Sequence, residues 1–446
     1  MLEFFNNSEV FFIKALQFLL SLSLLIIVHE LGHFIPARIF KTRVEKFFLF
    51  FDIKFALFKR KIGETIYGIG WLPLGGYVKI SGMIDESLDI KSNKEPPKPW
   101  EFRSKPTWQR LIIMLGGVIV NLLVGFGIYM MILFVWGKNE LKSEDFPLGF
   151  SPTPIAQELG FENGDQLVSV DGKELDNILD INRMLFLRNI EYVKVQRISG
   201  EIETIEIPDH LGNRMFQNGE IRPLEPSIIP IIDSVIPSSP AYRAGIQSGD
   251  QIIGISNQPV HSWNQMTQLV QKQPNLTIEV EYLRNQVEYF VNVTTDQNGH
   301  IGIFPKPMTI QLNNRELSLK ESITEGIDYG YWTLYDYIAQ FKYVFTKKGA
   351  SQLGGFGTIG NLFPRTWDWR QFWATTAFIS IILAFMNILP IPALDGGHVL
   401  FLIYEMVSGR KPHEKFLEYA QIFGLLILIS LVLYANGNDI IRFLNS

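Results

Sequence analysis

Four uninterrupted apolar stretches of membrane-spanning length constrain the fold of this chain more than any other feature. They cover residues 10–28, 111–136, 372–394 and 416–434. A helix needs about 20 mostly apolar residues to cross the hydrocarbon core of a bilayer, so each stretch is long enough. The first stretch contains one charge, Lys14, and it lacks the basic start and small-residue cleavage site of a secretory signal. We therefore predict four retained transmembrane helices.

The composition agrees with a chain that is only partly embedded. Hydrophobic residues make up 47% and charged residues 19% of the 446 residues, and the mean hydropathy is +0.13. This composition is too apolar for an ordinary soluble enzyme and too polar for a chain that lies wholly in the membrane. The net charge of -5 argues against a nucleic-acid partner. The absence of cysteine excludes disulfides, cysteine metal ligands and a cysteine nucleophile, and leaves the redox compartment open.

Basic residues in the short loops predict the orientation. They follow the first stretch at Arg38, Lys41, Arg43, Lys46, Lys59, Arg60 and Lys61, and they separate the last two stretches at Arg410, Lys411 and Lys415. By the positive-inside rule both loops face the cytoplasm. Both termini, and the long insert between the second and third stretches, are then expected outside.

Two segments of that insert repeat each other, one starting at Pro154 and the other at Pro240. Each reads as a short helix ended by glycine, then a Gly-Asp turn at 164–165 or 249–250, then an alternating apolar strand. Both resemble PDZ domains, the second more closely. Such domains bind an extended peptide as an added strand on a sheet edge. Inert spacers are the alternative, because peptide binding cannot be read from this pattern.

The first apolar stretch ends in the motif His29-Glu30-Leu31-Gly32-His33. Residues four apart lie on one face of a helix, so both histidines can offer imidazole nitrogens to one metal ion. Glu30 stands beside them, where it can accept a proton from a metal-activated water. Two histidines capping a span at the interface are the alternative, but these polar groups are costly on an apolar helix unless they serve a function.

A catalytic zinc needs a third protein ligand and an open position for water. The third stretch contains Asn387-Ile-Leu-Pro390-Ile-Pro392-Ala-Leu-Asp395-Gly-Gly-His398. Two prolines this close end a regular helix, and irregular backbone at membrane depth is tolerated only where it is buried or lines a cavity. Asp395 is therefore the candidate ligand, with an interfacial helix cap as the alternative. His398 is either a fourth ligand or a structural residue, and we favour the structural role.

Together the two motifs resemble those of the site-2 protease family of intramembrane metalloproteases. That family combines His-Glu-x-Gly-His at the end of a first span with Asn-x-x-Pro-x-Pro-x-Leu-Asp-Gly in a later one. The PDZ-like pair resembles the bacterial branch that degrades membrane-bound anti-sigma factors. The resemblance implies one Zn²⁺ per chain bound by His29, His33 and Asp395, with Glu30 activating the water.

The resemblance also implies which residues hold the substrate. In the third span these are Asn387, Pro390 and Pro392. The branch has a β-rich segment that dips into the membrane after the first span, and residues 67–79 match its Pro-x-Gly-Gly-Tyr-Val-Lys pattern. The substrate-binding positions there are Gly75, Gly76 and Tyr77.

One departure from the family pattern lies in the second span. The family usually has Gly-Pro-x-x-Asn, whereas this chain has Gly117-Val118-Ile119-Val120-Asn121. Gly117 and Asn121 are kept, so close packing near the zinc is still expected. The missing proline leaves the local bend open.

The expected fold class is a polytopic α-helical membrane protein with four transmembrane helices, a membrane-associated β-rich segment and two extracytoplasmic PDZ-like α/β domains. A further helix at residues 327–345 is expected to lie on the membrane surface. The glycine-rich stretch 354–360 lacks the lysine of a phosphate loop. The expected boundaries are 1–40 for the first helix, 41–107 for the β-rich segment and linker, 108–137 for the second helix, 138–222 and 223–308 for the PDZ-like domains, 309–370 for the amphipathic region, 371–404 for the third helix, and 405–446 for the cytoplasmic loop and fourth helix.

We expect an intramembrane zinc metalloendopeptidase of the bacterial inner membrane that cleaves transmembrane segments after an earlier external cut. A transmembrane helix hides its peptide bonds in backbone hydrogen bonds, so the substrate must unwind, and residues 74–78 can pair with the unwound strand. The implied partners are single-span membrane proteins, an upstream site-1-type protease and membrane lipid. Whether the substrate is an anti-sigma factor or a remnant signal peptide stays open.

Two other classes of function are also open. One is a catalytically silent scaffold whose PDZ-like domains bind exposed C-termini, which would tolerate loss of Glu30. The other is a membrane metalloprotease acting on soluble or unfolded segments outside the bilayer. A motif at the cytoplasmic end of an apolar helix argues against the second.

Overall fold

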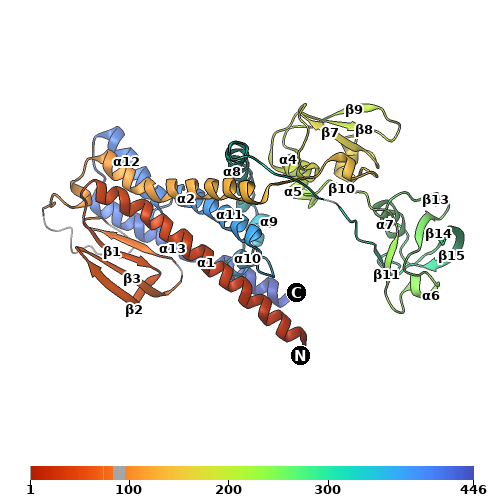
Figure 1. Cartoon of the computed structure of the whole chain (residues 1–446), viewed down its shortest axis with the longest axis horizontal. Coiled ribbons are helices and arrows are strands. Elements are labelled where there is room, and N and C mark those ends of the chain that lie inside the picture. Colours follow the sequence, from red (N-terminus) through yellow and green to blue (C-terminus); the bar gives the residue numbers. More distant parts are fainter. Residues whose placement is uncertain (1, 74, 84–95, 311, 446) are drawn as a thin grey trace. The chain divides into compact units, whose positions relative to one another are not determined.

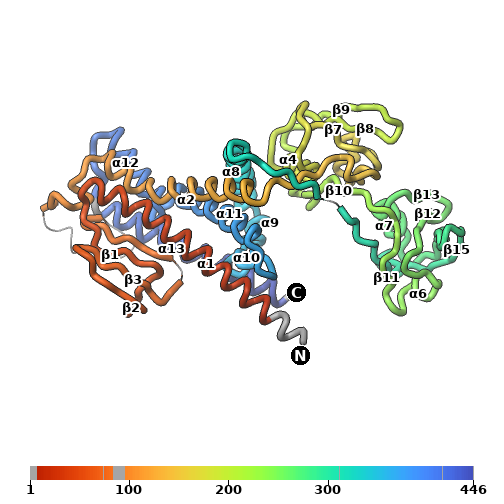
Figure 2. The backbone as a smooth tube through the Cα atoms, in the orientation of Figure 1, coloured from red at the N-terminus to blue at the C-terminus, as the bar shows by residue number. Residues whose placement is uncertain are grey.

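The computed structural model describes residues 2–73, 75–83, 96–310 and 312–445. Leu74 and residues 84–95, which belong to the expected β-rich segment and linker, lie outside this range. The chain forms two compact units, Met1–Gly137 with Glu316–Ser446, and Lys138–Arg315. Figures 1 and 2 show the chain leaving the first unit after α2 and returning to it before α8.

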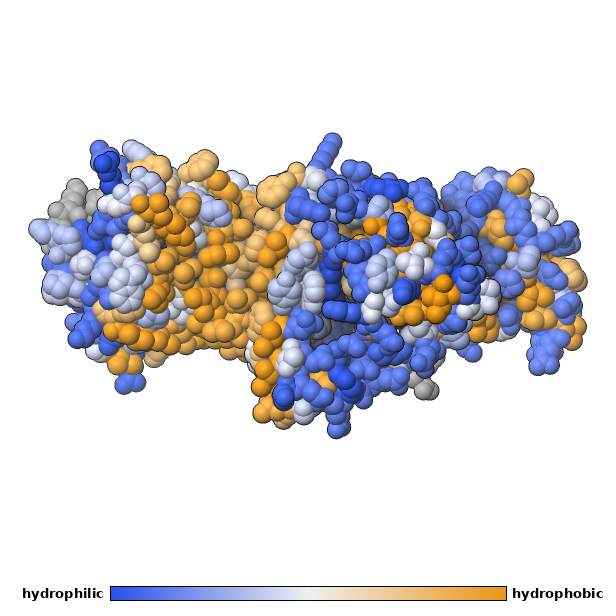
Figure 3. Space-filling model, turned by 90° about the horizontal axis from the view of Figure 1, so that it is seen from above, coloured by the Kyte–Doolittle hydropathy of each residue, from blue (hydrophilic) through white to orange (hydrophobic). Residues whose placement is uncertain are grey.

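Four helices of the first unit are long and apolar enough to cross a membrane. They are α1 (Leu2–Ile39), α2 (Thr107–Trp136), α11 (Trp369–Ile388) and α13 (Glu414–Asn445). The space-filling view shows apolar residues in a broad band over this unit (Figure 3). A contiguous apolar surface of this kind is rare on soluble proteins and is typical of a surface that faces lipid. The prediction of four apolar spans is confirmed.

Close helix packing in the first unit depends on small residues. A Cβ on Gly116 of α2 would lie 1.9 Å from the carbonyl oxygen of Gly32 of α1, so only glycine fits at this crossing. Buried hydroxyls add hydrogen bonds between spans: Thr376 Oγ1 donates to Ser21 Oγ over 3.0 Å. Small residues and interhelical hydrogen bonds are what hold helices together in lipid.

A four-stranded sheet follows α1. Its strands are β1 (Val44–Leu49), β2 (Phe51–Ile62), β3 (Thr65–Leu72) and β4 (Tyr77–Ile80). The order is β2-β3-β1-β4, with β1 parallel to β3 and antiparallel to β4. Strand β4 is therefore an edge strand, and it contacts α1. After the sheet, the short helix η2 (Phe102–Ser104) leads into α2.

The helix of the third span ends at Ile388, before the prolines, and not at Leu394 as its apolar length suggested. Pro390 and Pro392 lack the backbone donors that a continuing helix needs. The chain turns through residues 389–394 and begins a new helix, α12 (Asp395–Ser408). Asp395 thus occupies the first turn of α12.

The region between the insert and the third span forms four short or medium helices, α8 (Leu319–Phe341), η5 (Lys342–Phe345), α9 (Lys347–Gln352) and α10 (Phe356–Gly360). A capping box of Ser318 and Glu321 starts α8. Aromatic contacts tie α8 to α2 and α11, with Tyr329 4.6 Å from Tyr129 and Phe341 5.3 Å from Phe385 between ring centroids. The helix starts earlier than expected, and its position on a membrane surface remains a prediction.

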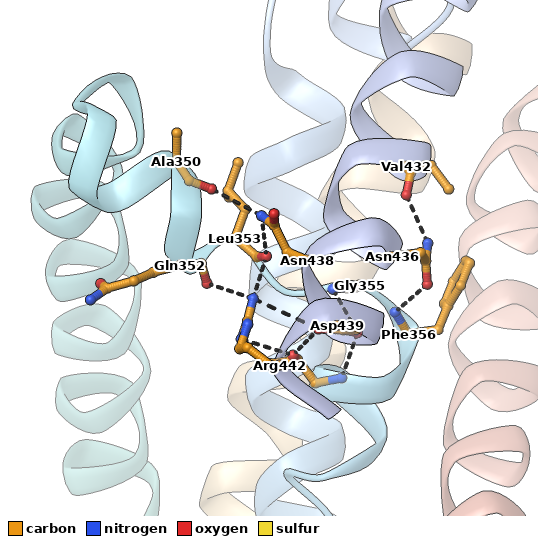
Figure 4. Close-up of polar contacts among 11 residues, drawn as sticks. Ala350, Gln352, Leu353, Gly355, Phe356, Val432, Asn436, Asn438, Asp439 and Arg442 are labelled. Atoms are coloured by element: carbon orange, nitrogen blue, oxygen red, sulfur yellow. Dashed lines mark hydrogen bonds and ion pairs between the residues drawn. The ribbon is translucent and has the colours of Figure 1, made fainter. Parts of the chain in front are cut away.

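The last turns of α13 hold the loop between α9 and α10 (Figure 4). The Asp439 carboxylate accepts hydrogen bonds from the backbone N–H groups of Gly355 and Thr358, each 3.0 Å long, and from the Thr358 hydroxyl. Arg442 donates to the carbonyl oxygen of Leu353 over 2.6 Å. The glycine-rich stretch therefore binds an internal carboxylate.

The second unit contains two lobes with separate hydrophobic cores. The first comprises β5 (Lys138–Glu140), η3 (Ser143–Asp145), β6 (Phe150–Pro152), α3 (Pro154–Glu158), β7 (Gln166–Val170), η4 (Ile178–Asp180), α4 (Ile181–Leu187), β8 (Tyr192–Gln196), β9 (Ile202–Glu206), α5 (Leu211–Asn218) and β10 (Leu224–Pro226). The second comprises β11 (Ile232–Val235), α6 (Pro240–Arg243), β12 (Gln251–Ile255), β13 (Gln258–Pro259), α7 (Trp263–Gln271), β14 (Thr277–Arg284), β15 (Val287–Thr294) and β16 (Ile303–Pro305).

Two strand pairs cross the domain boundaries expected from the sequence. β10 pairs with β6, so the first lobe continues past residue 222. β17 (Asn313–Arg315) pairs with β5, which places these residues in the insert and not in the amphipathic region. Neither pairing is visible in a local sequence pattern, because both join segments far apart in the chain.

Each lobe contains an equivalent arginine–aspartate contact, in addition to the shared pattern of elements. Arg197 in the first lobe donates to the carboxylate of Asp165 over 2.6 Å and to Gly160 O over 2.9 Å. Arg284 in the second lobe donates to Asp250 over 2.7 Å and to Gly245 O over 2.8 Å. Each arginine thus links the glycine after the short helix to the aspartate of the Gly-Asp turn.

Candidate metal centre

Three side chains that could hold a metal ion meet in the first unit. His29 and His33 lie one turn apart on α1, and Asp395 comes from the start of α12. Asp395 Oδ2 is 3.3 Å from His29 Nε2 and 3.4 Å from His33 Nε2, and the two Nε2 atoms are 3.2 Å apart. Within the described part of the chain this is the one group of histidine and acidic side chains arranged to hold a metal ion. The structure therefore brings together the three residues that the motifs suggested.

The surroundings of His33 select its tautomer. Nδ1 lies 2.8 Å from the carbonyl oxygen of Ile113 on α2, which can only accept a hydrogen bond. Nδ1 must therefore carry the proton, and the Nε2 lone pair points toward Asp395. A backbone carbonyl at the far nitrogen is the usual support of a metal-binding histidine.

Asn121 of α2 plays the matching part for His29. Its carboxamide lies 3.2 Å from His29 Nδ1. With the amide nitrogen toward the ring, Asn121 Oδ1 is buried without a partner. Rotating the carboxamide by half a turn lets Oδ1 accept the Nδ1 proton and leaves Nε2 free as a ligand. The α2 backbone at this residue is itself held, since Ser380 donates to Asn121 O over 2.7 Å.

These residues fit a zinc ion. Two ligands bound to tetrahedral zinc at about 2.0–2.1 Å lie roughly 3.3–3.4 Å apart, which the observed triangle matches closely. Three lone-pair atoms this close repel one another unless a proton or a metal cation lies among them. Asp395 Oδ2 is buried without a hydrogen-bond donor of its own. Three protein ligands also leave a fourth position open, as catalytic zinc requires.

Gly117 makes room for both imidazoles. A Cβ at this position would lie 2.4 Å from His33 Nε2 and 2.6 Å from His29 Cε1. The departure from the family pattern at Val118 does not interrupt α2, which continues as one helix from Thr107 to Trp136. The kept glycine, rather than the missing proline, decides the packing at the centre.

Glu30 faces the edge strand β4. Its side chain is buried, and its carboxylate lies near the backbone N–H of Val78. A Cβ on Gly76 would lie 3.7 Å from Glu30 Cγ and 2.5 Å from Ile26 Cγ2. Glycine therefore lets the start of β4 approach the helix at the residue between the two histidines.

Tyr77 is fixed in place at the start of β4. Its ring stacks on Phe48 and Phe51, with centroids 5.5 Å and 6.2 Å away. Its hydroxyl donates to Asp52 over 2.8 Å and accepts from Lys46 over 3.1 Å. Stacking and hydrogen bonds thus hold the Tyr77 side chain in one position.

The third-span residues lie at different distances from the centre. Asn387 Nδ2 is 3.5 Å from His29 Nε2, so its carboxamide borders the ligand triangle. Pro390 is exposed, and Pro392 carries its carbonyl toward α13. His398 lies on α12 and is absent from the ligand group found among the described residues. Sequence reasoning named Asn387 but missed Ile113, whose position only the tertiary fold reveals.

The fold and the centre together define a class of protein, one with four helices long and apolar enough to cross a membrane and a candidate site for one metal ion. The model of peptidase family M50 matches residues 17–431, and the chain belongs to that family. This confirms the resemblance to site-2 proteases and the prediction of zinc.

Named relatives match along nearly their whole length. The chain is 27% identical to the "putative zinc metalloprotease NMA0084" of Neisseria meningitidis, over 96% of this chain and 99% of that protein. It is also 27% identical to the "regulator of sigma E protease" of Haemophilus influenzae and to the "regulator of sigma-E protease RseP" of Escherichia coli, over 96% of this chain and 98% of each relative.

Proposed function

We propose that this chain is an intramembrane zinc metalloendopeptidase of the bacterial inner membrane that cleaves transmembrane segments of single-span proteins. The observation that carries the proposal is the triangle of His29, His33 and Asp395, built on apolar helices with Glu30 beside it. A scaffold has no need for three converging lone pairs in an apolar bundle, where polar side chains are costly.

The mechanism follows from the chain's own residues. When bound, zinc supplies Lewis-acid activation of a water molecule and of the scissile carbonyl. Glu30 accepts the proton of the attacking water and returns it to the leaving amine. Ile113 and Asn121 hold the histidines in the tautomer that exposes Nε2. The amide of Asn387, next to His29, is placed to donate to the carbonyl oxygen of the substrate.

The sheet offers a way to hold the substrate extended. β4 is an edge strand with its first residues against Glu30, so an unwound substrate can add to the sheet as a further strand. Gly75, Gly76 and Tyr77 then contact its backbone, and Pro390 and Pro392 border it from the third span. Residue 74 of the proposed pairing segment lies outside the described residues.

The two lobes of the insert are proposed to be PDZ-like domains on the extracytoplasmic side. Their repeated helix, left-handed glycine and strand support this assignment, with φ of 103° at Gly160 and 82° at Gly245. Two relatives carry the name "regulator of sigma E protease" or "regulator of sigma-E protease RseP". The proposed substrate class is therefore a membrane-bound anti-sigma factor, with remnant signal peptides as a second class. The lobes would exclude substrates whose external domain has not been removed by an upstream site-1-type protease.

The test is cleavage of a tagged single-span substrate whose outer domain is already trimmed. Wild type, Glu30→Gln and the exposed control Glu316→Gln are compared in detergent, with and without a chelator. We expect chelator-sensitive cleavage by wild type and Glu316→Gln only. Equal amounts of product from Glu30→Gln and wild type would favour the scaffold. Cleavage of an added unfolded soluble protein as fast as the single-span substrate would favour action outside the bilayer.

A further inference from the structure

The loop that leads to Asp395 contains a strained turn. Leu394 N–H donates to Ile391 O over 3.0 Å, with Pro392 and Ala393 at the two central positions. Ala393 has φ of +81°. Proline followed by a left-handed residue is the pattern of a type II turn, in which the second central position normally requires glycine or asparagine. An alanine there must be held by its surroundings.

The fourth span provides that support. Gln421 of α13 accepts a hydrogen bond from Ala393 N–H through Oε1, over 3.2 Å, and its side chain is 4% exposed. One turn further along α13, the backbone of Gly424 reaches Pro392 O so closely that a Cβ there would lie 1.6 Å from the oxygen. The two contacts fall on the N–H and the C=O of the same peptide unit, the one between Pro392 and Ala393.

That peptide unit decides the type of the turn. Types I and II differ by a flip of the central peptide, which exchanges the directions of its N–H and C=O. Flipping it here would leave Ala393 N–H and the amide of Gln421 unpaired in a buried site, which is costly. The turn ends one residue before Asp395, so the flip would also redirect the start of α12.

We propose that Gln421 is a positioning residue that locks this turn and thereby sets the Asp395 carboxylate against His29 and His33. This inference rests on the proposed function, because it takes Asp395 as a zinc ligand. Gln421 is buried within the fourth candidate span, where burying an amide is costly unless it is hydrogen-bonded. The fourth span, which supplies no ligand, thus supports the metal centre.

Metal affinity is the readout that separates this role from general packing. The full-length protein is loaded with zinc, and its dissociation constant is measured by competition with a chromophoric chelator. The variants are Gln421→Met, Ala393→Gly, the double variant and Asp395→Ala, with Gln371→Met as the matched control because Gln371 is exposed on α11. Met keeps the length of the side chain but cannot accept the hydrogen bond.

We expect Gln421→Met to weaken zinc binding by about tenfold or more, as loss of a supporting partner does at other metal sites. Ala393→Gly should restore most of this loss in the double variant, because glycine adopts a positive φ without strain. Zinc affinity of Gln421→Met equal to that of Gln371→Met would overturn the inference, as would failure of Ala393→Gly to restore binding. Unchanged affinity in Asp395→Ala would instead reject the proposed metal site itself.

Discussion

The Nδ1 atom of His33 lies 2.8 Å from the carbonyl oxygen of Ile113, although the two residues belong to different helices. This contact decides which nitrogen of the imidazole is protonated, and therefore that Nε2 faces His29 and Asp395. A backbone carbonyl cannot be removed by substituting a side chain. The proposed metal ligands are therefore the residues to substitute.

Replacing Asp395 by alanine removes one of three proposed ligands. We expect the zinc affinity to fall by more than about 100-fold, since even supporting residues of such sites account for 10–100-fold. Zinc content after gel filtration, measured by mass spectrometry, reports the loss. Asp328→Ala on the exposed face of α8 is the control and should retain one zinc. Full zinc occupancy in Asp395→Ala would mean that the aspartate caps α12 and does not bind the metal.

Two glycines of α2 should respond in opposite ways to alanine. Gly117→Ala places a Cβ within 2.4 Å of His33 Nε2, whereas a Cβ on Gly127 meets no atom within 4 Å. A displacement of about 1 Å at a catalytic centre costs roughly 100-fold in rate, so Gly117→Ala should lower the cleavage rate by about that factor. Gly127→Ala should keep activity and gain up to about 1 kcal/mol of helix stability. Similar activities of the two variants would show that α2 can shift away from the imidazoles.

The sequence predicted those parts of the centre that local geometry determines. His29 and His33 share a face because they lie four apart on a helix, and Pro390 and Pro392 had to end the third helix. The supports of the centre could not be predicted in the same way. Ile113 contributes a backbone oxygen, which carries no signal in the sequence. Gln421 stands out in the sequence as an amide within an apolar stretch, but its hydrogen bond to Ala393 could not be predicted.

The same limit applies to the insert. The Gly-Asp turns at 164–165 and 249–250 are local patterns, and the strands that follow them were expected. Their arginine partners, Arg197 and Arg284, follow later in the chain, where nothing in the local sequence marks them. The pairing depends on how the strands are ordered in each sheet.

Arg197→Met should destabilise the first lobe of the insert. The side chain of Asp165 is 2% exposed, and a buried carboxylate that loses its partner costs about 3–5 kcal/mol. Arg214→Met is the matched control, because its ion pair with Glu158 is exposed and such pairs contribute about 1 kcal/mol or less. The urea concentration at which a protease first cuts the insert measures the difference. Equal midpoints for the two variants would contradict the prediction.

The contribution of Asp176 to stability should depend on pH. Partial burial acts to raise the pKa of its carboxyl, but hydrogen bonds and charges from Lys138 and Lys142 outweigh this, and the pKa lies below its ordinary value. A lowered pKa in the folded state gives stability that is present above about pH 3.9 and is lost as the pH falls through the folded pKa. Asp176→Asn should therefore lower the thermal midpoint at pH 7, by an amount that shrinks toward pH 3. Because the carboxyl is half exposed, the effect stays below about 1 kcal/mol. A difference that is constant with pH would assign it to packing.

Asp439→Ala should loosen the loop between α9 and α10. The carboxylate accepts two backbone N–H groups and the Thr358 hydroxyl, so its removal leaves these donors without their partner. The chain has no cysteine, so a single cysteine at Ile359, which is half-buried in α10 against a hydrophobic core, can be labelled selectively with a maleimide. We expect labelling to be several-fold faster in the Asp439→Ala background, because local opening exposes the thiol. Asp328→Ala again serves as the control, since Asp328 is exposed on α8 and belongs to no contact of this loop. Equal labelling rates in both backgrounds would mean that Arg442 and Asn438 hold the loop closed without the carboxylate.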